Sequence, residues 1–585
     1  MQPFIRILGE TTNRSPEVGD VVPWRLSTHV VTPEGLTRSL VRQVEIDDER
    51  GERVFAAPPL IIGPRPPDLE RFDRQGQAMD CEYEPVLELD RLDRGSYMVR
   101  ARLETDDGDV VAESCLPIRP EPPPRLQSRI RLAWAPSEDP FERLYTGGIV
   151  RAGDIDGDGR VEIVHAVGAR HVCVYRLDGE VVWRYDDPDG AIIYNTAPFR
   201  VHDIDGDGCA EIFCCRGPFG DLKLAMLDGA TGDVRRDIPF PLMAETEVAA
   251  RPHLETLKQD PKSEQGWAGM WQTGYTVRFA FDPESGTRFG LYGAKIIVSD
   301  FRGRGLRDLL VQVGDQNCTS LVALDEHLDE LWRHRVDDGY GGHTPAAADL
   351  DGDGRDEIAV GTRLLDHDGT LLWRKPFDQF AAPWEDDHID QAHAGPFGPD
   401  GAPVIVYSCR VCVDPATGET RWIEPTWHGQ EAHVARMLPG DAYQAVFSER
   451  EYRHSGHLCH GTWFDCRDAE GRPLWSYRHA ALHMHRMLDW NGDGLYEASF
   501  GLDLQRRPVR PNLGIFDGEG QLTCVLPRYG FGADVDGDGF DELVSWTQWP
   551  DVADTIEIYG MDRAAMERGR AVPASLNPFS YNEPD

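Results

Sequence analysis

The sequence predicts an all-β protein in which an N-terminal β-sandwich precedes an eight-bladed β-propeller. The first observation is a nine-residue segment, DIDGDGRVE at 154–162, that recurs four times almost letter for letter. The second is that each copy runs into a short apolar segment such as EIV or ELV, which indicates a strand. The further copies are DIDGDGCAE at 203–211, DLDGDGRDE at 349–357, DWNGDGLYE at 489–497 and DVDGDGFDE at 534–542.

The N-terminal region has the pattern of a separate β domain. Short runs between residues 16 and 118 alternate apolar and polar side chains and are separated by turn residues, so an immunoglobulin- or fibronectin-like sandwich is expected over 1–118. The prolines of PEPPP at 120–124 predict a stiff linker over 119–128.

The spacing of the loops predicts the number of blades. Their first residues are 154, 203, 300, 349, 489 and 534, counting the degenerate copy DFRGRGLRD at 300–308. Steps near 47 residues fit one four-stranded blade each. The longest gap is expected to hold two blades without the motif, and the gap after 203 an insertion at about 243–289. Eight blades then fill 129–565, with RIRLAWA at 129–135 closing the ring and 566–585 left as a tail.

The repeated loop has the chemistry of a cation site. Oxygen-bearing side chains at positions 1, 3, 5 and 9, with glycine turns at 4 and 6, suit a hard cation of calcium's size. EF-hand and dockerin loops are excluded because position 12 holds no carboxylate. A metal-free Gly/Asp turn is the alternative. The predicted calcium ligands are Asp154, Asp156, Asp158, Glu162, Asp203, Asp205, Asp207, Glu211, Asp349, Asp351, Asp353, Glu357, Asp489, Asn491, Asp493, Glu497, Asp534, Asp536, Asp538 and Glu542.

Charge and hydropathy narrow the class of partner. The formal net charge of -41 argues against nucleic acid, because phosphate binding relies on clusters of Lys and Arg. No stretch of about 18 apolar residues predicts a membrane span. The N-terminus as written lacks a secretory signal and the chain has 12 cysteines, so a cytoplasmic protein is expected; a chain trimmed of its signal would be secreted.

The loops that lead into the innermost strands are the expected functional site. In a propeller these loops open on the central channel, so their residues converge although they are distant in sequence. Here they are rich in His and Tyr, which suits acid–base chemistry. The candidate catalytic residues are His343, His388, His393, His428, His433, Arg528 and Tyr529. The candidate substrate-binding residues are Tyr194, Asn195, Tyr292, Lys295, Tyr340, His483 and His485.

Two chemistries fit such a set of side chains. One is β-elimination on a uronic acid, which needs a cation for the carboxylate, a base for the C5 proton and an acid for the leaving oxygen. The other is an additional divalent metal held by several neutral imidazoles. The two chemistries are compatible with each other.

Several motifs resemble those of polysaccharide lyase family 11, the rhamnogalacturonan lyases. The stretch GGHTPAAADLDGDGRDEIAVGTRLLDHDG followed by DDHIDQAHAGPF is the most specific, and YNTAPFRVHDIDGDGCAEI and FGADVDGDGFDELVSWTQ are similar to further blades of that family. The resemblance covers roughly 145–560. It implies an eight-bladed propeller, calcium dependence, eliminative cleavage of a rhamnose and galacturonate backbone, and substrate-facing roles for His343, His388 and His393.

Three hypotheses of function follow from the residues and the resemblance. The first is a calcium-dependent lyase that acts on a uronate-containing oligosaccharide or polysaccharide, with Arg528 or a bound cation neutralising the carboxylate. The second is a non-catalytic propeller that binds carbohydrate or protein at the channel mouth. The third is a glycosidase with paired carboxylates, for which the candidates are Glu385, Asp386, Asp387 and Asp390.

Overall fold

In the computed structural model, the regular structure of the described residues is almost entirely β-strand. Among the residues it describes, no helix has the length and apolar content needed to cross a bilayer. The described residues are 4–13, 15–32, 39–62, 80–88, 92, 95–134, 148–190, 198–218, 221–241, 256, 281–282, 286–287, 295–315, 318–336, 342–376, 389–424, 429–449, 462–479, 485–501, 512–527, 530–546 and 554–561.

The N-terminal strands form two sheets whose burial follows their sequence pattern. Strands β3 and β7 alternate buried and half-buried side chains, as a period of two requires when one face of a sheet covers a core. One sheet contains β1 (Phe4–Thr11), β2 (Trp24–Thr32) and β6 (Asp80–Glu88). The other contains β3 (Leu40–Asp48), β4 (Arg53–Ala56), β5 (Leu60–Ile62), β7 (Tyr97–Thr105) and β8 (Val110–Ile118).

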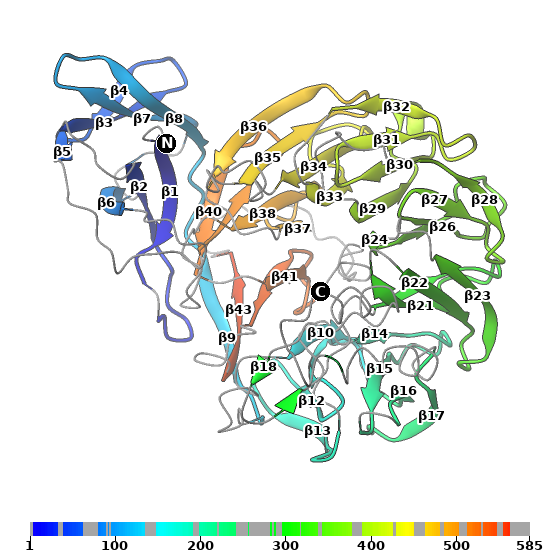
Figure 1. The fold of residues 1–585 in the computed structure, drawn as a ribbon. Coiled ribbons are helices and arrows are strands. Elements are labelled where there is room, and N and C mark those ends of the chain that lie inside the picture. The colour runs from blue at the N-terminus through cyan, green and yellow to red at the C-terminus, as the bar shows by residue number, and fades with distance from the viewer. Residues whose placement is uncertain are drawn as a thin grey trace.

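The first four blades follow in chain order around a ring (Figure 1). Blade 1 is β10 (Ile149–Gly153), β11 (Glu162–Val167), β12 (His171–Tyr175) and β13 (Val181–Asp186). Blade 2 is β14 (Arg200–His202), β15 (Glu211–Arg216), β16 (Lys223–Leu227) and β17 (Val234–Pro239). Blade 3 is β20 (Lys295–Ser299), β21 (Asp308–Asp315), β22 (Cys318–Leu324) and β23 (Glu330–Val336). Blade 4 is β25 (Ala346–Ala348), β26 (Glu357–Val360), β27 (Arg363–Leu365) and β28 (Leu371–Arg374).

The remaining blades include the two that the spacing predicts to lack the motif. Blade 5 is β29 (Ile389–Gly395), β30 (Val404–Tyr407), β31 (Val411–Val413) and β32 (Thr420–Ile423), with a 3₁₀ turn η3 (Pro399–Gly401). Blade 6 is β33 (Gly429–Ala435), β34 (Gln444–Glu449), β35 (Thr462–Arg467) and β36 (Pro473–His479). Blade 7 is β37 (His485–Leu488), β38 (Glu497–Gly501), β39 (Leu513–Phe516) and β40 (Leu522–Leu526). Blade 8 is β41 (Gly530–Ala533), β42 (Glu542–Ser545), β43 (Thr555–Gly560) and β9 (Arg125–Arg131).

The prediction of an eight-bladed propeller behind a β-sandwich is confirmed. Strand β9 pairs antiparallel with β43, so a strand from before the first blade completes the last one. This strand begins at Arg125, four residues before the start predicted for it. The predicted insertion at 243–289 lies mostly outside the described residues, although β18 (Phe281–Asp282) and β19 (Gly286–Thr287) pair within it. The predicted tail at 566–585 also lies outside them.

The sandwich docks on the outer edge of blade 7. Strand β8 pairs in parallel with β40, and the backbone amides of Arg119 and Glu121 continue this edge by donating to the carbonyls of Leu522 and Thr523. One buried apolar cluster runs from the sandwich into blades 6 and 7. The outer edge of blade 7 is therefore covered, which protects it from pairing with another chain.

The inner strand of each blade separates two ends of the propeller. The chain enters the strand from the loops rich in His and Tyr and leaves it at the acidic loop, as β10 does when it ends one residue before Asp154. At about 3.3 Å per residue, the five residues of β10 separate the two ends by about 16 Å. We call the first the entrance end and the second the loop end.

A tryptophan on the outer strand of five blades clasps the next blade. Each indole Nε1 donates to a main-chain carbonyl in the turn before the neighbouring outer strand, and a left-handed glycine of that turn lies against the ring. Gly418, for example, has a φ of 66° and leaves no room for a Cβ beside Trp373. The pairs are Trp183 to Gly229 (2.6 Å), Trp332 to His367 (2.7 Å), Trp373 to Pro415 (2.6 Å), Trp422 to Ala469 (3.2 Å) and Trp475 to Gly518 (2.9 Å).

Two other junctions use a different side chain at the same place. In blade 2 the tryptophan is replaced by Arg236, which pairs with Asp329 in the turn of blade 3. In the last blade Ser128 donates its hydroxyl to the carbonyl of Leu177 in blade 1. The repeated clasp accordingly joins neighbouring blades through hydrogen bonds as well as apolar packing.

Removing one clasp should weaken the ring. We expect Trp373→Ala to lower the free energy of unfolding by about 2 kcal/mol, because it removes the ring from Gly418 and the donor from the Pro415 carbonyl. Trp373→Phe keeps most of the ring and should cost about 1 kcal/mol. Leu372, the neighbouring residue, is 48 % exposed, and Leu372→Ala is the control with an effect under about 0.5 kcal/mol. Equal effects of Trp373→Ala and Leu372→Ala in urea unfolding would contradict the clasp.

Candidate functional site

The acidic loops share one backbone geometry. In blade 1 the carboxylate of Asp154 accepts hydrogen bonds from the amides of Gly157 (2.8 Å) and Gly159 (2.9 Å), which curl the chain around it. Both glycines have positive φ values of 74° and 83°, a conformation that few other residues adopt without strain. The same pair of bonds recurs in blades 2, 4 and 8, so the motif fixes the fold of the loop before any ion binds.

The glutamate at position 9 points a carboxylate oxygen into each loop. In blade 4, Oε2 of Glu357 accepts the amide of Leu350 at 2.8 Å, whereas its buried Oε1 has no hydrogen-bond partner among the described residues. The buried Oδ1 of Asp489 in blade 7 also has no hydrogen-bond partner among the described residues. Such oxygens fit a bound cation, because buried charged atoms otherwise need a partner.

Ligand atoms converge in the loops of four blades. The groups that bring three acidic or imidazole ligand atoms within 4.8 Å of one another are Asp154, Asp156 and Glu162; Asp203, Asp205 and Glu211; Asp349, Asp351 and Asp353; Asp353, Glu357 and His367; and Asp534, Asp536 and Glu542. Sets of carboxylate oxygens at this spacing are compatible with a divalent metal. Within the described residues, none of these groups contains His343, His393 or His433, so an imidazole-bound metal at the entrance end stays a prediction.

Burial changes the acidity of the position 9 carboxyls when no cation is bound. It raises the pKa of Glu162 and of Glu357 from the ordinary 4.5 to about 7, with a smaller contribution from the neighbouring aspartates. It raises the pKa of Glu497 and Glu542 further. A cation in the loop would have to displace these protons, because only the ionised carboxylate coordinates metal.

The acidic loops are also linked to one another around the ring. The carboxylate of Asp356 in blade 4 accepts the amide of Asp300 in blade 3 at 2.7 Å, and the Asp356 amide donates to the Asp300 carbonyl. Asp541 of blade 8 and Asp489 of blade 7 repeat both bonds. At these two junctions one loop therefore braces its neighbour, so the conformation of one loop affects the packing of the next blade.

At the entrance end, polar side chains form a chain of contacts from blade 3 to blade 7. Short strand β24 (Gly342–Thr344) runs into blade 4 and pairs in parallel with β29 of blade 5, which brings two entrance loops together. We call the polar residues of this region the entrance cluster. Its members are Gln312, His343, Asp390, Gln391, His393, Glu431, His433 and Arg486.

A histidine and an aspartate form the first pair of the entrance cluster. Nε2 of His343 lies 3.0 Å from Oδ1 of Asp390, and the aspartate is 9 % exposed. The amide of Gln312, which is fully buried, donates to the main-chain carbonyls of Gly342 and His343 at 3.1 Å. Because a carboxylate only accepts, the Nε2–H of His343 donates to Asp390, and in the neutral ring Nδ1 is then the basic nitrogen.

The second pair of the entrance cluster is formed by two histidines. The rings of His393 and His433 lie 5.2 Å apart, edge to face, and His433 is fully buried. Gln391 accepts the amide of Ala432 through Oε1 at 3.3 Å, which turns its Nε2 toward Nε2 of His393 at 3.1 Å. His393 thus accepts at Nε2 and carries its proton on Nδ1.

Charges of both signs also lie on the inner strands of blades 2, 3, 6 and 7. Oε1 of Glu431 lies 3.6 Å from the guanidinium of Arg486, across the junction of blades 6 and 7. Lys295, at the start of the inner strand of blade 3, and Arg200, at the start of that in blade 2, are 6 % and 3 % exposed. Cations at the starts of neighbouring inner strands create a positive potential that attracts an anionic group.

The structure describes only part of the predicted site. Lys295 begins β20 and His343 lies in β24, both at the entrance end. His393 and His433 lie inside the inner strands β29 and β33 and not in the loops before them, because these strands begin earlier than the sequence pattern indicates. His485 begins β37, although its side chain is not described. The remaining predicted residues lie outside the described part of the chain. They are His388, His428, Arg528, Tyr529, Tyr194, Asn195, Tyr292, Tyr340 and His483, together with the glycosidase candidates Glu385, Asp386 and Asp387.

Sequence reasoning missed Gln312, Gln391, Glu431 and Arg486. Gln391 and Glu431 had a detectable signal, because each stands two residues before a histidine, in QAH and EAH, and therefore shares its face of the strand. Asp390 was considered only as a paired carboxylate of a glycosidase. Its contact with His343 instead makes it the partner of an imidazole.

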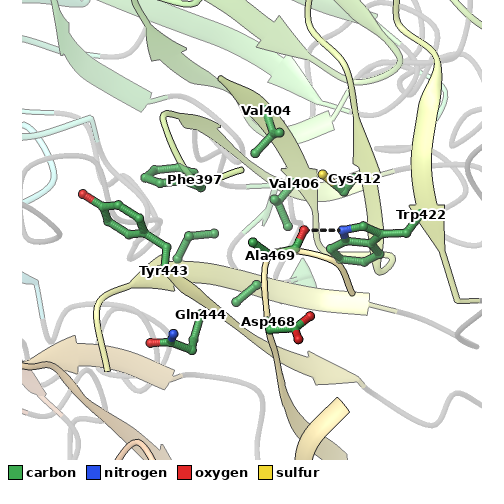
Figure 2. A pocket seen from close by; sticks show the side chains of 11 residues that line it. Phe397, Val404, Val406, Cys412, Trp422, Tyr443, Gln444, Asp468 and Ala469 are labelled. Carbon is green, nitrogen blue, oxygen red and sulfur yellow. Dashed lines mark hydrogen bonds between the residues drawn. The ribbon is translucent and has the colours of Figure 1, made fainter. Parts of the chain in front are cut away.

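A cavity between blades 5 and 6 does not belong to this site. Figure 2 shows that Phe397, Val404, Val406 and Trp422 line it, with the polar Gln444 and Asp468 at one side. The indole Nε1–H of Trp422 already donates to the carbonyl of Ala469 in the clasp between the two blades. A mostly apolar lining without a convergent set of acids and bases makes this cavity a packing gap.

The fold and the entrance cluster define a β-propeller with a buried polar site that contains several imidazoles. No family model matches the chain. The chain is 28% identical over 326 residues to the rhamnogalacturonan exolyase YesX of Bacillus subtilis (strain 168), a match that covers 48% of this chain and 48% of that protein. It is 24% identical over 339 residues to the rhamnogalacturonan endolyase YesW of the same organism, covering 49% and 51%.

The solved structure of the exotype rhamnogalacturonan lyase YesX has the same fold. It aligns with a TM-score of 0.51 at 18% identity, over 96% of this chain and 89% of that chain. The resemblance to the rhamnogalacturonan lyases of polysaccharide lyase family 11 is confirmed in sequence similarity and in fold. The chain spans about half the length of the curated relatives it matches.

The raised pKa values make stability without metal depend on pH. A carboxyl whose folded pKa is about 7 and whose unfolded pKa is near 4.5 binds its proton more tightly in the folded state. Its contribution to stability is therefore full below pH 4.5 and is lost as the pH rises through 7. We expect the melting temperature of the chelated protein to fall between pH 5 and pH 8, and a divalent cation to reverse the fall.

The control is the same melting series with the cation at saturating concentration throughout, where the loops hold ionised carboxylates at every pH. A chelated protein that becomes more stable as the pH rises from 5 to 8 would contradict the assignment of protons to these glutamates.

Proposed function

We propose that the protein is a calcium-stabilised lyase that cleaves a uronate-containing glycan, of the rhamnogalacturonan type, by β-elimination at the entrance end of the channel. The His343–Asp390 pair carries the proposal, because it is an imidazole base held by a carboxylate. Two buried cations, Lys295 and Arg200, begin inner strands of other blades. The similarity to two rhamnogalacturonan lyases supports the substrate class.

The reaction requires three groups at the entrance end: a base, an acid that protonates the leaving oxygen, and a cation. The proton on C5 of the uronate goes to a base, the electron pair of that C–H bond forms the C4–C5 double bond, and the C4–O bond breaks with its electrons on the leaving oxygen, which takes up a proton. A cation near the carboxylate stabilises the charge that develops when C5 loses its proton. No oxidant or reductant is needed.

The described residues supply candidates for the base and for the cation. His343 is the proposed base, because Asp390 holds its Nε2–H and stabilises the imidazolium formed when Nδ1 takes the C5 proton. Lys295 and Arg200 supply positive potential for the carboxylate. The Nε2 lone pair of His393 is engaged by Gln391, so His393 suits hydrogen bonding to a sugar better than proton abstraction.

Calcium is the proposed cation of the acidic loops. Carboxylate oxygens in a flexible loop suit calcium, whereas magnesium demands near-ideal octahedral geometry and gives up its water reluctantly. The loop end lies across the blade from the entrance cluster, so calcium would act on the scaffold and not on the glycan. In the melting series above, calcium should raise the melting temperature at pH 8 more than magnesium does.

Substitution of the proposed base should abolish turnover and spare binding. We expect wild-type protein with calcium to release unsaturated uronate from a rhamnogalacturonan-type glycan, measured by ultraviolet absorbance. His343→Ala should lower kcat by about 100-fold or more with KM largely kept, because it removes the proton acceptor. Asp390→Asn should lower kcat and shift the pH profile, because the imidazolium loses its carboxylate.

The matched control is His327→Ala, since His327 lies in the turn between β22 and β23, away from the entrance end. It should leave kcat and KM unchanged. Failure of the wild-type protein to release unsaturated product from any uronate-containing glycan would overturn the proposed reaction. Loss of glycan affinity in His343→Ala without any turnover in the wild type would assign the entrance end to a binding protein instead.

A further inference from the structure

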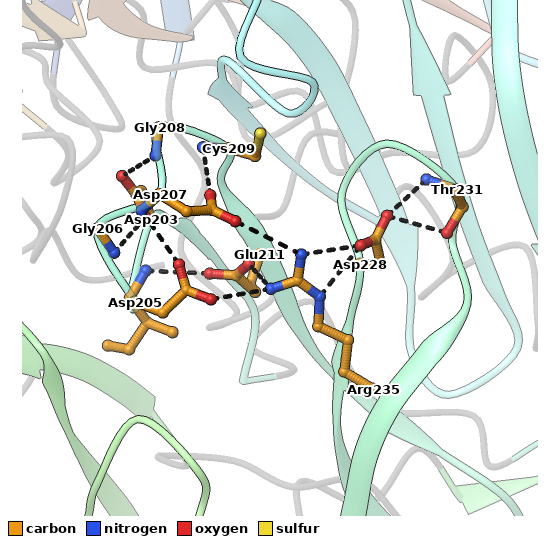
Figure 3. Close-up of polar contacts among 11 residues, drawn as sticks. Asp203, Asp205, Gly206, Asp207, Gly208, Cys209, Glu211, Asp228, Thr231 and Arg235 are labelled. Atoms are coloured by element: carbon orange, nitrogen blue, oxygen red, sulfur yellow. Dashed lines mark hydrogen bonds and ion pairs between the residues drawn. The ribbon is translucent and has the colours of Figure 1, made fainter.

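The second acidic loop has an intact motif but already contains a cation of its own. The guanidinium of Arg235, on the outer strand β17, reaches between the position 3 and position 9 carboxylates (Figure 3). Its Nη1 lies 3.2 Å from Oδ2 of Asp205 and pairs with Oε1 of Glu211, whose side chain is fully buried. These two oxygens are ones that a metal in the loop would need.

The guanidinium is held in this position from its other side. Asp228 accepts from Nε of Arg235 at 3.1 Å and from Nη2 at 2.8 Å. Thr231 fixes that aspartate by donating its amide and its hydroxyl to Oδ1, each at 2.9 Å. A planar guanidinium paired in this way has a fixed direction, so Nη1 points into the loop.

A second guanidinium lies beside the same loop. Arg307 of blade 3 packs so closely on Gly206 that a Cβ on this glycine would meet the guanidinium group. Gly206 is position 4 of the loop, between the two aspartates at positions 3 and 5. Both arginines oppose a divalent cation there by repulsion of like charge.

The other blades with intact motifs lack this arginine. In blade 2, Arg235 follows Val234, the first residue of the outer strand, which pairs with Leu227 of the third strand. The first residues of the outer strands in blades 1, 4 and 7 pair in the same way: Val181 with Tyr175, Leu371 with Leu365 and Leu522 with Phe516. The residues equivalent to Arg235 are accordingly Val182 in blade 1, Leu372 in blade 4, Thr523 in blade 7 and Gln127 in blade 8, where the register shift falls between Leu126 and Ser128. None of these side chains can neutralise a carboxylate.

The degenerate loop of blade 3 contains a similar arrangement, but there the arginine belongs to the loop itself. Its position 3 is Arg302, whose guanidinium lies 2.6 Å from the position 9 carboxylate of Asp308 and also pairs with Glu326. Asp308 is fully buried. In this blade an arginine has taken the place of a ligand and supplies the positive charge that the buried carboxylate requires.

We propose that Arg235 is the resident cation of the second loop, so that blade 2, like blade 3, is closed by a guanidinium and does not hold calcium. This inference rests on the calcium loops of the proposed function. Blades 2 and 3 would then form a metal-independent sector of the ring, whereas blades 1, 4, 7 and 8 depend on calcium.

Counting bound ions tests the proposal. Native mass spectrometry of the full chain, at the free calcium concentration that fills the other loops, should find one more calcium in Arg235→Gln than in the wild type. Arg421→Gln is the matched control, because Arg421 makes the same kind of pair with Asp414 in blade 5, at 2.8 Å, beside a loop without the motif. Its calcium count should equal that of the wild type.

The two ways in which the count can fail are distinguishable. Equal, non-zero counts in the wild type and Arg235→Gln would remove the role of Arg235 and leave the calcium scaffold standing, whereas no ion in either would remove both. A second measurement uses only the wild type. After chelation, hydrogen exchange should rise at 154–162 and 349–357 and stay unchanged at 203–211; an equal rise at all three would overturn the proposal.

Discussion

The buried carboxylate at position 9 of each loop is the constraint on which the propeller depends. Glu162, Glu211, Glu357, Glu497 and Glu542 all lie under 5 % exposed, where a bare charge is costly. The blades meet this constraint in different ways. Blade 3 pairs its carboxylate with Arg302, and blade 6 replaces it with the neutral amide of Gln444, which accepts the amides of Met437 and Leu438. Blade 5 replaces it with the apolar Val404.

Placing the charged loops at one end of the inner strands leaves the other end available for chemistry. Blades 5 and 6, which have given up the acidic loop, contribute Asp390, Gln391 and His393 and Glu431 and His433 to the entrance cluster. These side chains contact one another across blade junctions, so their geometry depends on how firmly the blades are held. The clasps and the linked loops hold the blades and thereby position an imidazole beside its carboxylate.

Much of the fold could be predicted from the sequence, but less of the candidate site. Blade number followed from loop spacing, because each repeat is one unit that buries its face only against a neighbour. The partners of His343 and Glu211 did not follow, because Asp390 and Arg235 belong to other strands and meet them only through the register of the folded sheet. The clasping tryptophans recur in WRY, WRH and WRK, but a contact between blades leaves no fixed spacing to detect.

The central claim is that the two ends of the inner strands have separate tasks, and hydrogen exchange of the calcium-loaded protein with and without a rhamnogalacturonan oligosaccharide tests it most directly. The account predicts slower exchange at 342–344, 389–395 and 429–435 when the oligosaccharide is present, with no change at 154–162 and 349–357. Protection of the acidic loops by the oligosaccharide, with the entrance end unchanged, would contradict it.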